Sequence, residues 1–283
     1  IDGCSTATEG PLQVLEGTIP PELTCEYHAG GWFRAPTPKI EHLLDCYSCS
    51  VRYRIASGEA TYRSHPCHDP LHDAEVASGK ILRKGYFTPK STKGLGRITH
   101  VFGRRAIHDV VCFDGLAIQT TQSKFYYVDP DSLEDSDRDL LASAHPAPSA
   151  TRSYNNHPQI DPATGHLMVY TYEVSPTFTT RYRLMEVPPG GGPIKTRQYA
   201  WPHLLAPHAY GFTRSYHVLP DISCRFHPVK FVLGVTPLLR EAVDDLSRGI
   251  EFHLVPRGDG PPIRARFQQP GYVYHLTNCF EAD

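Results

Sequence analysis

The sequence predicts an all-β protein of the β-propeller type, and three observations support this class. Short runs rich in β-branched and aromatic residues recur along the 283-residue chain and are separated by turn residues. The chain holds 26 prolines and 22 glycines, which suits many tight turns. Three turns, near residues 128, 160 and 254, repeat the order of apolar residue, proline turn and returning strand. Such repetition of antiparallel hairpins favours a propeller over a single sandwich.

The individual strands follow from local patterning. Residues 107–113 and 116–121 form the clearest predicted hairpin, because the Asp-Gly pair between them is the strongest short-range hairpin signal. A helical period appears once, at residues 238–246, and the polar stretch 66–96 is expected to be a surface excursion. No linker interrupts the chain, so residues 1–283 are expected to form one partial propeller domain. Further strands are expected at 51–55, 60–63, 125–128, 167–173, 179–185, 250–255, 263–267 and 272–274.

Composition argues against several classes of function. With 40% hydrophobic residues, 20% charged residues and a formal net charge of -2, the chain lacks the basic excess of a nucleic-acid binder. No apolar run approaches the roughly 20 residues of a membrane-spanning helix. The eight cysteines are irregularly spaced, which favours reduced thiols in an intracellular compartment. The 16 histidines are more informative, because histidine is the common ligand of borderline metals.

Three histidines are candidate metal ligands, and each stands where a strand is expected to begin or end. His157 lies in NNHPQIDPATG, ahead of a proline-glycine turn, so it is expected at the rim of a hairpin. His208 in APHAYGFTRSYHVLP and His275 in GYVYHLTNCFEAD stand at comparable positions. A strand end is rigid but open at its tip, so imidazoles there can reach a shared centre. Taken alone, the stretch around His157 favours a plain turn cap.

These three segments resemble, in order, the iron-ligand motifs of the carotenoid cleavage oxygenases. That family also contains the retinoid isomerase of the visual cycle and the stilbene-cleaving oxygenases. The first segment is similar to the family's AHP-x-x-D-P-x-T-G, the second to H-D-F-x-x-T-x-N-Y-x-V and the third to F-x-F-H-x-x-N-A-Y-E. Weaker matches lie at residues 17–34, 42–64 and 252–261. Three ordered matches with matched flanks favour a ligand role for His157 over a turn cap.

The resemblance implies a seven-bladed β-propeller with a non-haem Fe(II) centre, in which His157, His208 and His275 are both metal-binding and catalytic. It implies that O2 adds across one double bond of a carotenoid or apocarotenoid and yields two carbonyl fragments, in a tunnel lined by aromatic side chains. The apolar segment Phe231 to Leu239 follows the second motif, where relatives carry an apolar patch at the tunnel mouth. It is expected either to dock peripherally on a membrane or to be a buried strand.

The chain departs from the family pattern in two ways that bear on the metal. The family has a fourth ligand histidine well beyond the third, which here would lie past Asp283. The chain therefore matches only the first part of the pattern, an apparently incomplete propeller. A glutamate that orients a ligand imidazole in the family falls near Thr121 and Gln122 here. Loss of that carboxylate would weaken metal binding.

Two other classes of function stay open from the sequence. Cys46, Cys49, Cys67 and His72 approximate the ligand set of a zinc-binding module, although their spacing is loose. A non-catalytic propeller that serves only for binding is the third class, because the glutamate and the fourth histidine are not found. Metal analysis separates the first two classes, and oxygen uptake with a carotenoid separates the enzyme from the binding protein.

Overall fold

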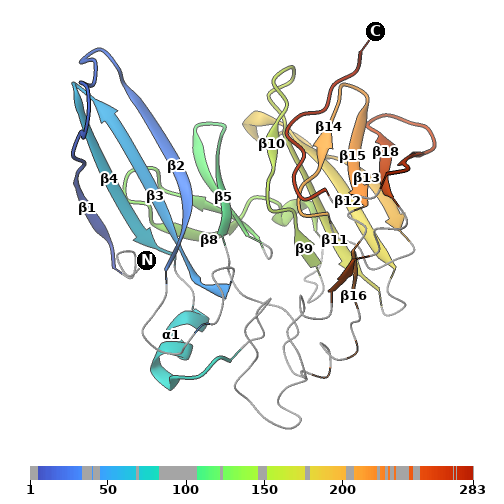
Figure 1. Ribbon diagram of the computed structural model, residues 1–283, viewed down its shortest axis with the longest axis horizontal. Helices are drawn as coiled ribbons and strands as arrows, with labels where there is room; N and C mark the ends of the chain where they lie inside the picture. The colour runs from blue at the N-terminus through green and yellow to red at the C-terminus, as the bar shows by residue number, and fades with distance from the viewer. Residues whose placement is uncertain are drawn as a thin grey trace. The chain divides into compact units, whose positions relative to one another are not determined.

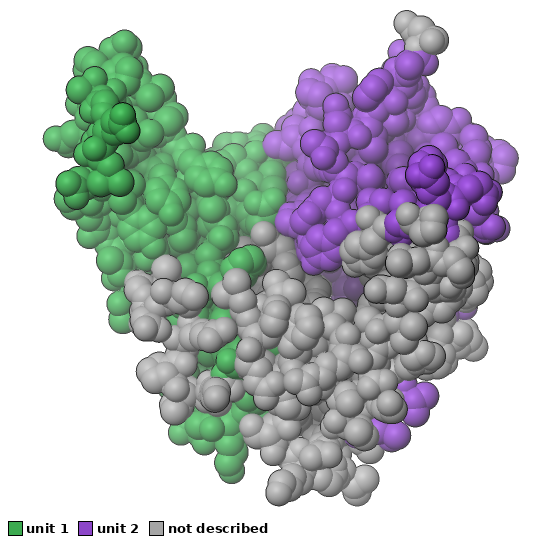
Figure 2. Space-filling view, viewed as in Figure 1, with its two compact units in different colours: residues 1–146 green, residues 147–283 purple. Residues whose placement is uncertain are grey.

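Nearly all regular secondary structure in the computed structural model is β-strand, arranged in separate antiparallel sheets (Figure 1). The all-β prediction is therefore confirmed. The chain divides into two compact units, residues 1–146 and 147–283 (Figure 2), and each is described by itself. That the two units form one domain stays a prediction. The structure describes residues 6–33, 40, 45–67, 70–82, 107–121, 124–145, 152–175, 179–201, 207–221, 224–226, 229, 233, 242–244, 249–269, 271 and 273–282.

The first unit, residues 1–146, contains two four-stranded antiparallel sheets, with strand orders β1-β4-β3-β2 and β5-β6-β7-β8. Turn chemistry explains the two tightest hairpins, because Ser57, Gly58, Asp114 and Gly115 all have positive φ, as type I′ turns require. Both hairpins are confirmed, and β5 and β6 begin and end where they were predicted. The strands are β1 (Thr8–Pro11), β2 (Cys25–Phe33), β3 (Tyr47–Ala56), β4 (Glu59–Pro66), β5 (Ile107–Phe113), β6 (Leu116–Thr121), β7 (Phe125–Val128) and β8 (Asp135–Asp139).

The stretch 66–96, expected to be a surface excursion, contains the helix α1 (Pro70–Ser78). Glu75 on this helix is fully buried. The Tyr47 hydroxyl and the Leu82 N–H each donate a hydrogen bond to its carboxylate at 2.8 Å. Residues 73, 74 and 76–80 are exposed, as expected for a surface excursion, but the helix was not predicted. The buried carboxylate, which accepts two hydrogen bonds, anchors this helix to β3. Residues 83–96 lie outside the described residues.

The second unit, residues 147–283, contains a five-stranded antiparallel sheet, a four-stranded antiparallel sheet and one strand pair. The first sheet has the order β10-β11-β12-β13, with β9 also paired to β11, and the second has the order β14-β15-β18-β19. β16 pairs with β17. The strands are β9 (Arg152–Tyr154), β10 (Gln159–Ile160), β11 (Leu167–Val174), β12 (Thr180–Val187), β13 (Lys195–Trp201), β14 (Gly211–Phe212), β15 (Tyr216–Asp221), β16 (Cys224–Phe226), β17 (Ala242–Asp244), β18 (Ile250–Pro256) and β19 (Ile263–Phe267).

The core of the second unit is a cluster of aromatic and aliphatic side chains drawn from both large sheets. Tyr170 of β11 and Leu184 of β12 pack in one cluster with Leu219 of β15 and Val255 of β18. Tyr210, which precedes β14, meets the Tyr170 ring edge-on, with ring centroids 5.1 Å apart. This cluster packs the two sheets of the unit against each other. The candidate site lies beside the edge strands β10 and β14 of these sheets.

Three further predictions need correction or lie outside the described residues. Residues 242–244 form β17, where the apolar period predicted a helix, and the rest of 238–246 is not described. Val273 and Tyr274 are not in a strand, contrary to the strand expected at 272–274. Of the apolar segment 231–239, only Leu233 is among the described residues. No helix in the described part of the chain is long and apolar enough to cross a membrane.

Candidate metal centre

His157 lies in a short interruption of one sheet edge. β9 and β10 both pair with β11, opposite residues 171–173 and 167–168 respectively, and residues 155–158 stand between them. Asn155 anchors this interruption: its N–H donates to the Tyr170 carbonyl and its Oδ1 accepts from the Tyr170 N–H, both at 3.0 Å. Pro158 has no N–H to pair, so the ladder breaks at this point. His157 is therefore held at the rim of the sheet, as the sequence predicted.

His208 is held from two sides. The Tyr170 hydroxyl donates a hydrogen bond to the carbonyl of Pro207, the residue before it. The Tyr274 ring stacks on the His208 ring, with centroids 4.0 Å apart and an interplanar angle of 11°. β14 starts at Gly211, three positions later, so the imidazole stands just ahead of a strand. Stacking on Tyr274 therefore sets the plane of the His208 ring, and the hydrogen bond from Tyr170 fixes the backbone just before His208.

His275 lies in an irregular segment, residues 273–282, instead of at the end of a strand. This segment packs closely against β14. A Cβ added at Gly211 would collide with Cys279 Sγ and would come 3.4 Å from a Leu276 methyl group. The segment therefore lies as close as it does only because residue 211 has no side chain.

The structure brings all three candidate histidines together. The Nε2 atoms of His157 and His208 are 2.9 Å apart. The three ring centroids are 4.8, 4.9 and 5.1 Å apart, and one nitrogen from each ring lies within 4.8 Å of the other two. His157 and His208 are half-buried, and His275 is exposed. Within the described part of the chain, this is the only group of three or more histidine, cysteine or acidic side chains that could share a metal ion.

The donor set is one that a first-row transition metal accepts. Neutral imidazoles suit iron, zinc and copper. Partial desolvation, together with the nearby His157 ring, lowers the pKa of His275, which favours the neutral form that binds a metal. An ion about 2.1 Å from each nitrogen would hold the nitrogens roughly 3 to 3.5 Å apart. The His157–His208 pair, at 2.9 Å, is already near this separation.

Asn156 is placed to influence which nitrogen of His208 carries the proton. Its side-chain amide lies 2.9 Å from His208 Nδ1, with the amide nitrogen toward the ring. Amide nitrogen and oxygen exchange by a half-turn, and the oxygen would accept a hydrogen bond from a protonated Nδ1. As the amide is placed, its nitrogen donates to Nδ1, which favours the Nε2–H tautomer. Only after the half-turn would the amide oxygen hold Nδ1–H and leave the Nε2 lone pair that a metal requires. No sequence motif indicated this contact.

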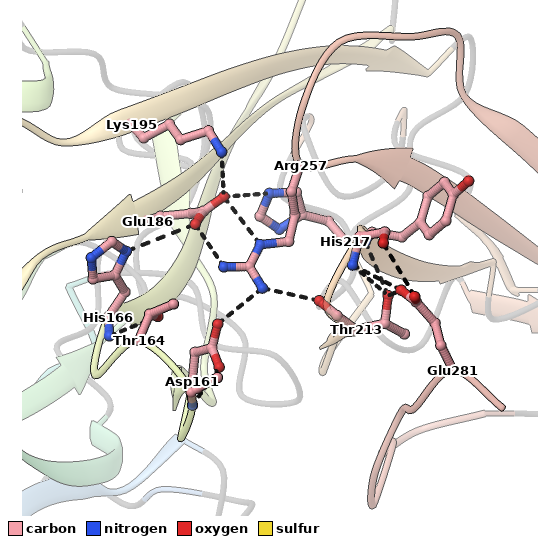
Figure 3. A network of polar contacts seen from close by, with 12 residues as sticks. Asp161, Thr164, His166, Glu186, Lys195, Thr213, His217, Arg257 and Glu281 are labelled. Carbon is pink, nitrogen blue, oxygen red and sulfur yellow. Dashed lines mark hydrogen bonds and ion pairs between the residues drawn. The ribbon is translucent and has the colours of Figure 1, made fainter. Parts of the chain in front are cut away.

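A buried ion-pair network extends from the turn that follows His157 (Figure 3). Arg257 Nη1 lies 2.9 Å from Asp161 Oδ2, and its Nε and Nη2 contact Glu186 at 3.2 and 2.8 Å. Burial alone would raise the pKa of each carboxyl. The Ala163 N–H at Asp161 and the guanidinium at Glu186 outweigh burial and hold both pKa values below their ordinary range. Both carboxyls are therefore charged partners of Arg257 at neutral pH.

Two histidines to which the sequence attached no role are buried in the same unit. His217 Nε2 lies 4.0 Å from a Glu186 oxygen. His253 Nδ1 contacts the Tyr199 hydroxyl at 2.5 Å, and its Nε2 lies 3.2 Å from Glu251. Burial lowers the pKa of each imidazole to about 4. Both rings are therefore neutral at pH 7 and serve packing, which sequence patterning does not separate from a ligand role.

The alternative zinc ligands are not brought together. Cys46 and Cys49 pack in one apolar cluster and Cys67 in another. The His72 ring stands edge-on to the Tyr47 ring, with centroids 4.3 Å apart. The described residues therefore do not favour the zinc module. Thr121, where the orienting glutamate was expected, hydrogen-bonds within its own turn to Lys124, and Gln122 lies outside the described residues.

Comparison with known proteins adds a family and a fold. The family model described as "Retinal pigment epithelial membrane protein" matches residues 3–283. The apocarotenoid-15,15'-oxygenase of Synechocystis sp. is 22% identical over 95% of this chain and 56% of its own length. The carotenoid 9,10(9',10')-cleavage dioxygenase 1 of Arabidopsis thaliana is 24% identical over 95% and 52%. This chain thus spans just over half the length of these relatives.

A solved structure shows the same fold. The crystal structure of cobalt-substituted Synechocystis ACO superposes with a TM-score of 0.83 at 18% sequence identity, over 99% of this chain and 60% of that chain. At this sequence identity the structural similarity is evidence for the fold alone. The prediction of a propeller-type all-β fold is therefore confirmed, with partial coverage.

Acidification from pH 7 to pH 5 is expected to lower the free energy of unfolding. The folded pKa of His217 and His253 is about 4, below the ordinary value near 6.5. As the pH falls below about 6.5, the unfolded chain therefore binds protons that the folded chain does not. At pH 5 the loss is at most about 2 kcal/mol per histidine. Urea midpoints at the two pH values measure it, and His253→Gln should show a weaker pH dependence; an unchanged dependence would contradict this account.

Proposed function

Because this chain belongs to the retinal pigment epithelial membrane protein family, we propose that the protein carrying it is a non-haem Fe(II)-dependent dioxygenase. Its substrate is a carotenoid or apocarotenoid, of which it cleaves one C=C double bond. Two relatives named as an apocarotenoid oxygenase and a carotenoid cleavage dioxygenase support this substrate class. Both atoms of one O2 enter the products, so the alkene gives two carbonyl fragments and the reaction needs no further reductant.

The observation that carries the proposal is the convergence of three histidines from distant parts of the chain. His157 and His208 are 51 positions apart in the sequence, yet their Nε2 atoms are 2.9 Å apart. A hydrogen bond between the rings accounts for the His157–His208 contact, but it does not account for His275, whose ring nitrogen lies within 4.8 Å of both. A shared metal ion accounts for all three rings. The family supports iron over zinc or copper, since imidazole accepts all three.

The residues of the centre have separable tasks. Bound Fe(II) would supply coordination positions at which O2 is activated. His157, His208 and His275 would hold the ion through ring nitrogens and, being neutral, would leave its charge intact. Tyr274 keeps the His208 ring in its plane. This tyrosine is 41% exposed, so it also offers an aromatic surface beside the centre to an apolar polyene.

Alanine at His157, His208 or His275 should remove most of the iron and the oxygenase activity of the full-length protein, because each variant loses one ligand. Iron per protein and oxygen uptake with a carotenoid, an apocarotenoid and a stilbene measure the two effects. The matched control is His253→Gln, which changes a buried histidine that is not in the trio. Iron retained in all three alanine variants would overturn the metal site. Iron without oxygen uptake on any substrate would favour a binding protein.

Replacing Asn156 with alanine should weaken Fe(II) binding about 10- to 100-fold, because the His208 tautomer loses its orienting partner. Asn156→Asp should keep the affinity, since a carboxylate accepts a hydrogen bond from Nδ1–H equally well. Competition with a chelator of known affinity measures both. Equal affinity of the alanine variant and the wild type would show that the amide does not set the tautomer.

We further propose an intracellular protein with peripheral membrane contact through Phe231–Leu239, a segment too short to span a bilayer. Leu233, its described residue, is 50% exposed, which suits docking through apolar area. Aspartate at Phe231 and Leu233 together should release the full-length protein from liposomes in a flotation assay. Unchanged flotation would show that the segment packs internally.

A further inference from the structure

Each candidate histidine is followed, a few residues later, by a member of one polar network (Figure 3). Asp161 stands four positions after the first histidine, Thr213 five after the second, and Glu281 six after the third. The three segments that carry the histidines are therefore connected a second time, at a point away from the imidazoles.

Arg257 connects the first two segments. Its Nη1 lies 2.9 Å from Asp161 Oδ2 and donates to the Thr213 carbonyl at 3.0 Å. Its own N–H donates to the Ser215 carbonyl at 2.8 Å. The side chains of Arg257 and Asp161 are 11% and 6% exposed, so this contact is shielded from water and from salt. A planar guanidinium makes these contacts at fixed angles, which a lysine ammonium does not.

Glu281 connects the second and third segments. One carboxylate oxygen accepts from the Thr213 hydroxyl at 2.6 Å and from the Ser215 N–H at 2.8 Å. The other accepts from the Ser215 hydroxyl at 3.1 Å. The hydrogen bond from Thr213, then those from Ser215, lower the pKa of Glu281, so the carboxylate is charged at neutral pH. This contact brings the irregular segment of the third histidine onto the turn that follows the second.

We propose that Arg257, Thr213 and Glu281 are positioning residues that set the spacing of the three histidines for a metal ion. This inference rests on the proposed function. The links act close to the imidazoles, since only four to six residues separate each link from its histidine. The third histidine depends on them most, because its segment contains no strand within the described residues 273–282.

A second cluster of charges on the same sheet provides a matched control. Arg264 and Arg266 of β19 pair with Glu251 of β18 at 2.5 and 2.7 Å. This pairing involves none of the three histidine-bearing segments. A variant of this pair therefore shows what the loss of an ion pair outside the network does to metal binding.

The test uses the full-length protein with Thr213→Val, Glu281→Ala, the double variant, and Thr213→Ser as the conservative rescue. Arg266→Met is the control. Fe(II) affinity and the visible absorption spectrum of the Co(II)-substituted protein are measured, because the spectrum reports coordination geometry whatever the activity. We expect the Val and Ala variants to bind Fe(II) about 10- to 100-fold more weakly with an altered Co(II) spectrum. The double variant should be no weaker than the worse single variant, because Glu281→Ala already removes the Thr213–Glu281 hydrogen bond that Thr213→Val removes.

Thr213→Ser and Arg266→Met should bind as the wild type does. If the wild type binds iron through the histidines and the Val and Ala variants keep its affinity and spectrum, the positioning role fails while the proposed function stands. Additive losses in the double variant would also overturn it, since the two residues would then act separately. If the wild type binds no iron, both the proposed function and the positioning role fail.

Discussion

The buried Tyr170 provides the contacts on which the geometry of the centre depends. Its main chain exchanges two hydrogen bonds with Asn155, and its hydroxyl donates to the carbonyl of Pro207. The segments that carry His157 and His208 are thereby both hydrogen-bonded to one residue of β11. Burial raises the pKa of this phenol well above its ordinary value, so it remains a donor. A buried carbonyl that loses such a donor costs about 1 to 3 kcal/mol.

Elements with a local signal were predictable from the sequence, and the others were not. β5 and β6 match their expected ranges because the Asp-Gly turn between them fixes the register. β9, β10 and β14 are two or three residues long, so they show no period and form only where a longer strand offers a partner. At residues 242–244 the pairing with β16 overrides a helical pattern.

The candidate site divides in the same way. The three histidines could be identified because their segments resemble, in order, the ligand motifs of one family, whereas the turn at His157 taken alone favoured a cap. Asn156 and Arg257 could not, since Asn156 contacts a ring 52 positions away and Arg257 a carboxylate 71 positions away. In the sequence Asn156 is an ordinary turn residue, and Arg257 is one of many arginines. Only the tertiary placement of β11, β12 and β18 gives either residue a partner.

His275 lies in the irregular segment 273–282 and is held differently from the other two candidate ligands. His157 and His208 stand on backbone tied to the sheets, whereas His275 is held by close packing at Gly211 and by one carboxylate. Local opening of such a segment breaks few backbone hydrogen bonds, so its free energy lies well below that of global unfolding. An ion held by all three rings would then be loaded and lost at the rate at which this short segment opens. The kinetic lability of the metal would thus depend on the contacts that these ten residues make with β14 and with the turn before β15.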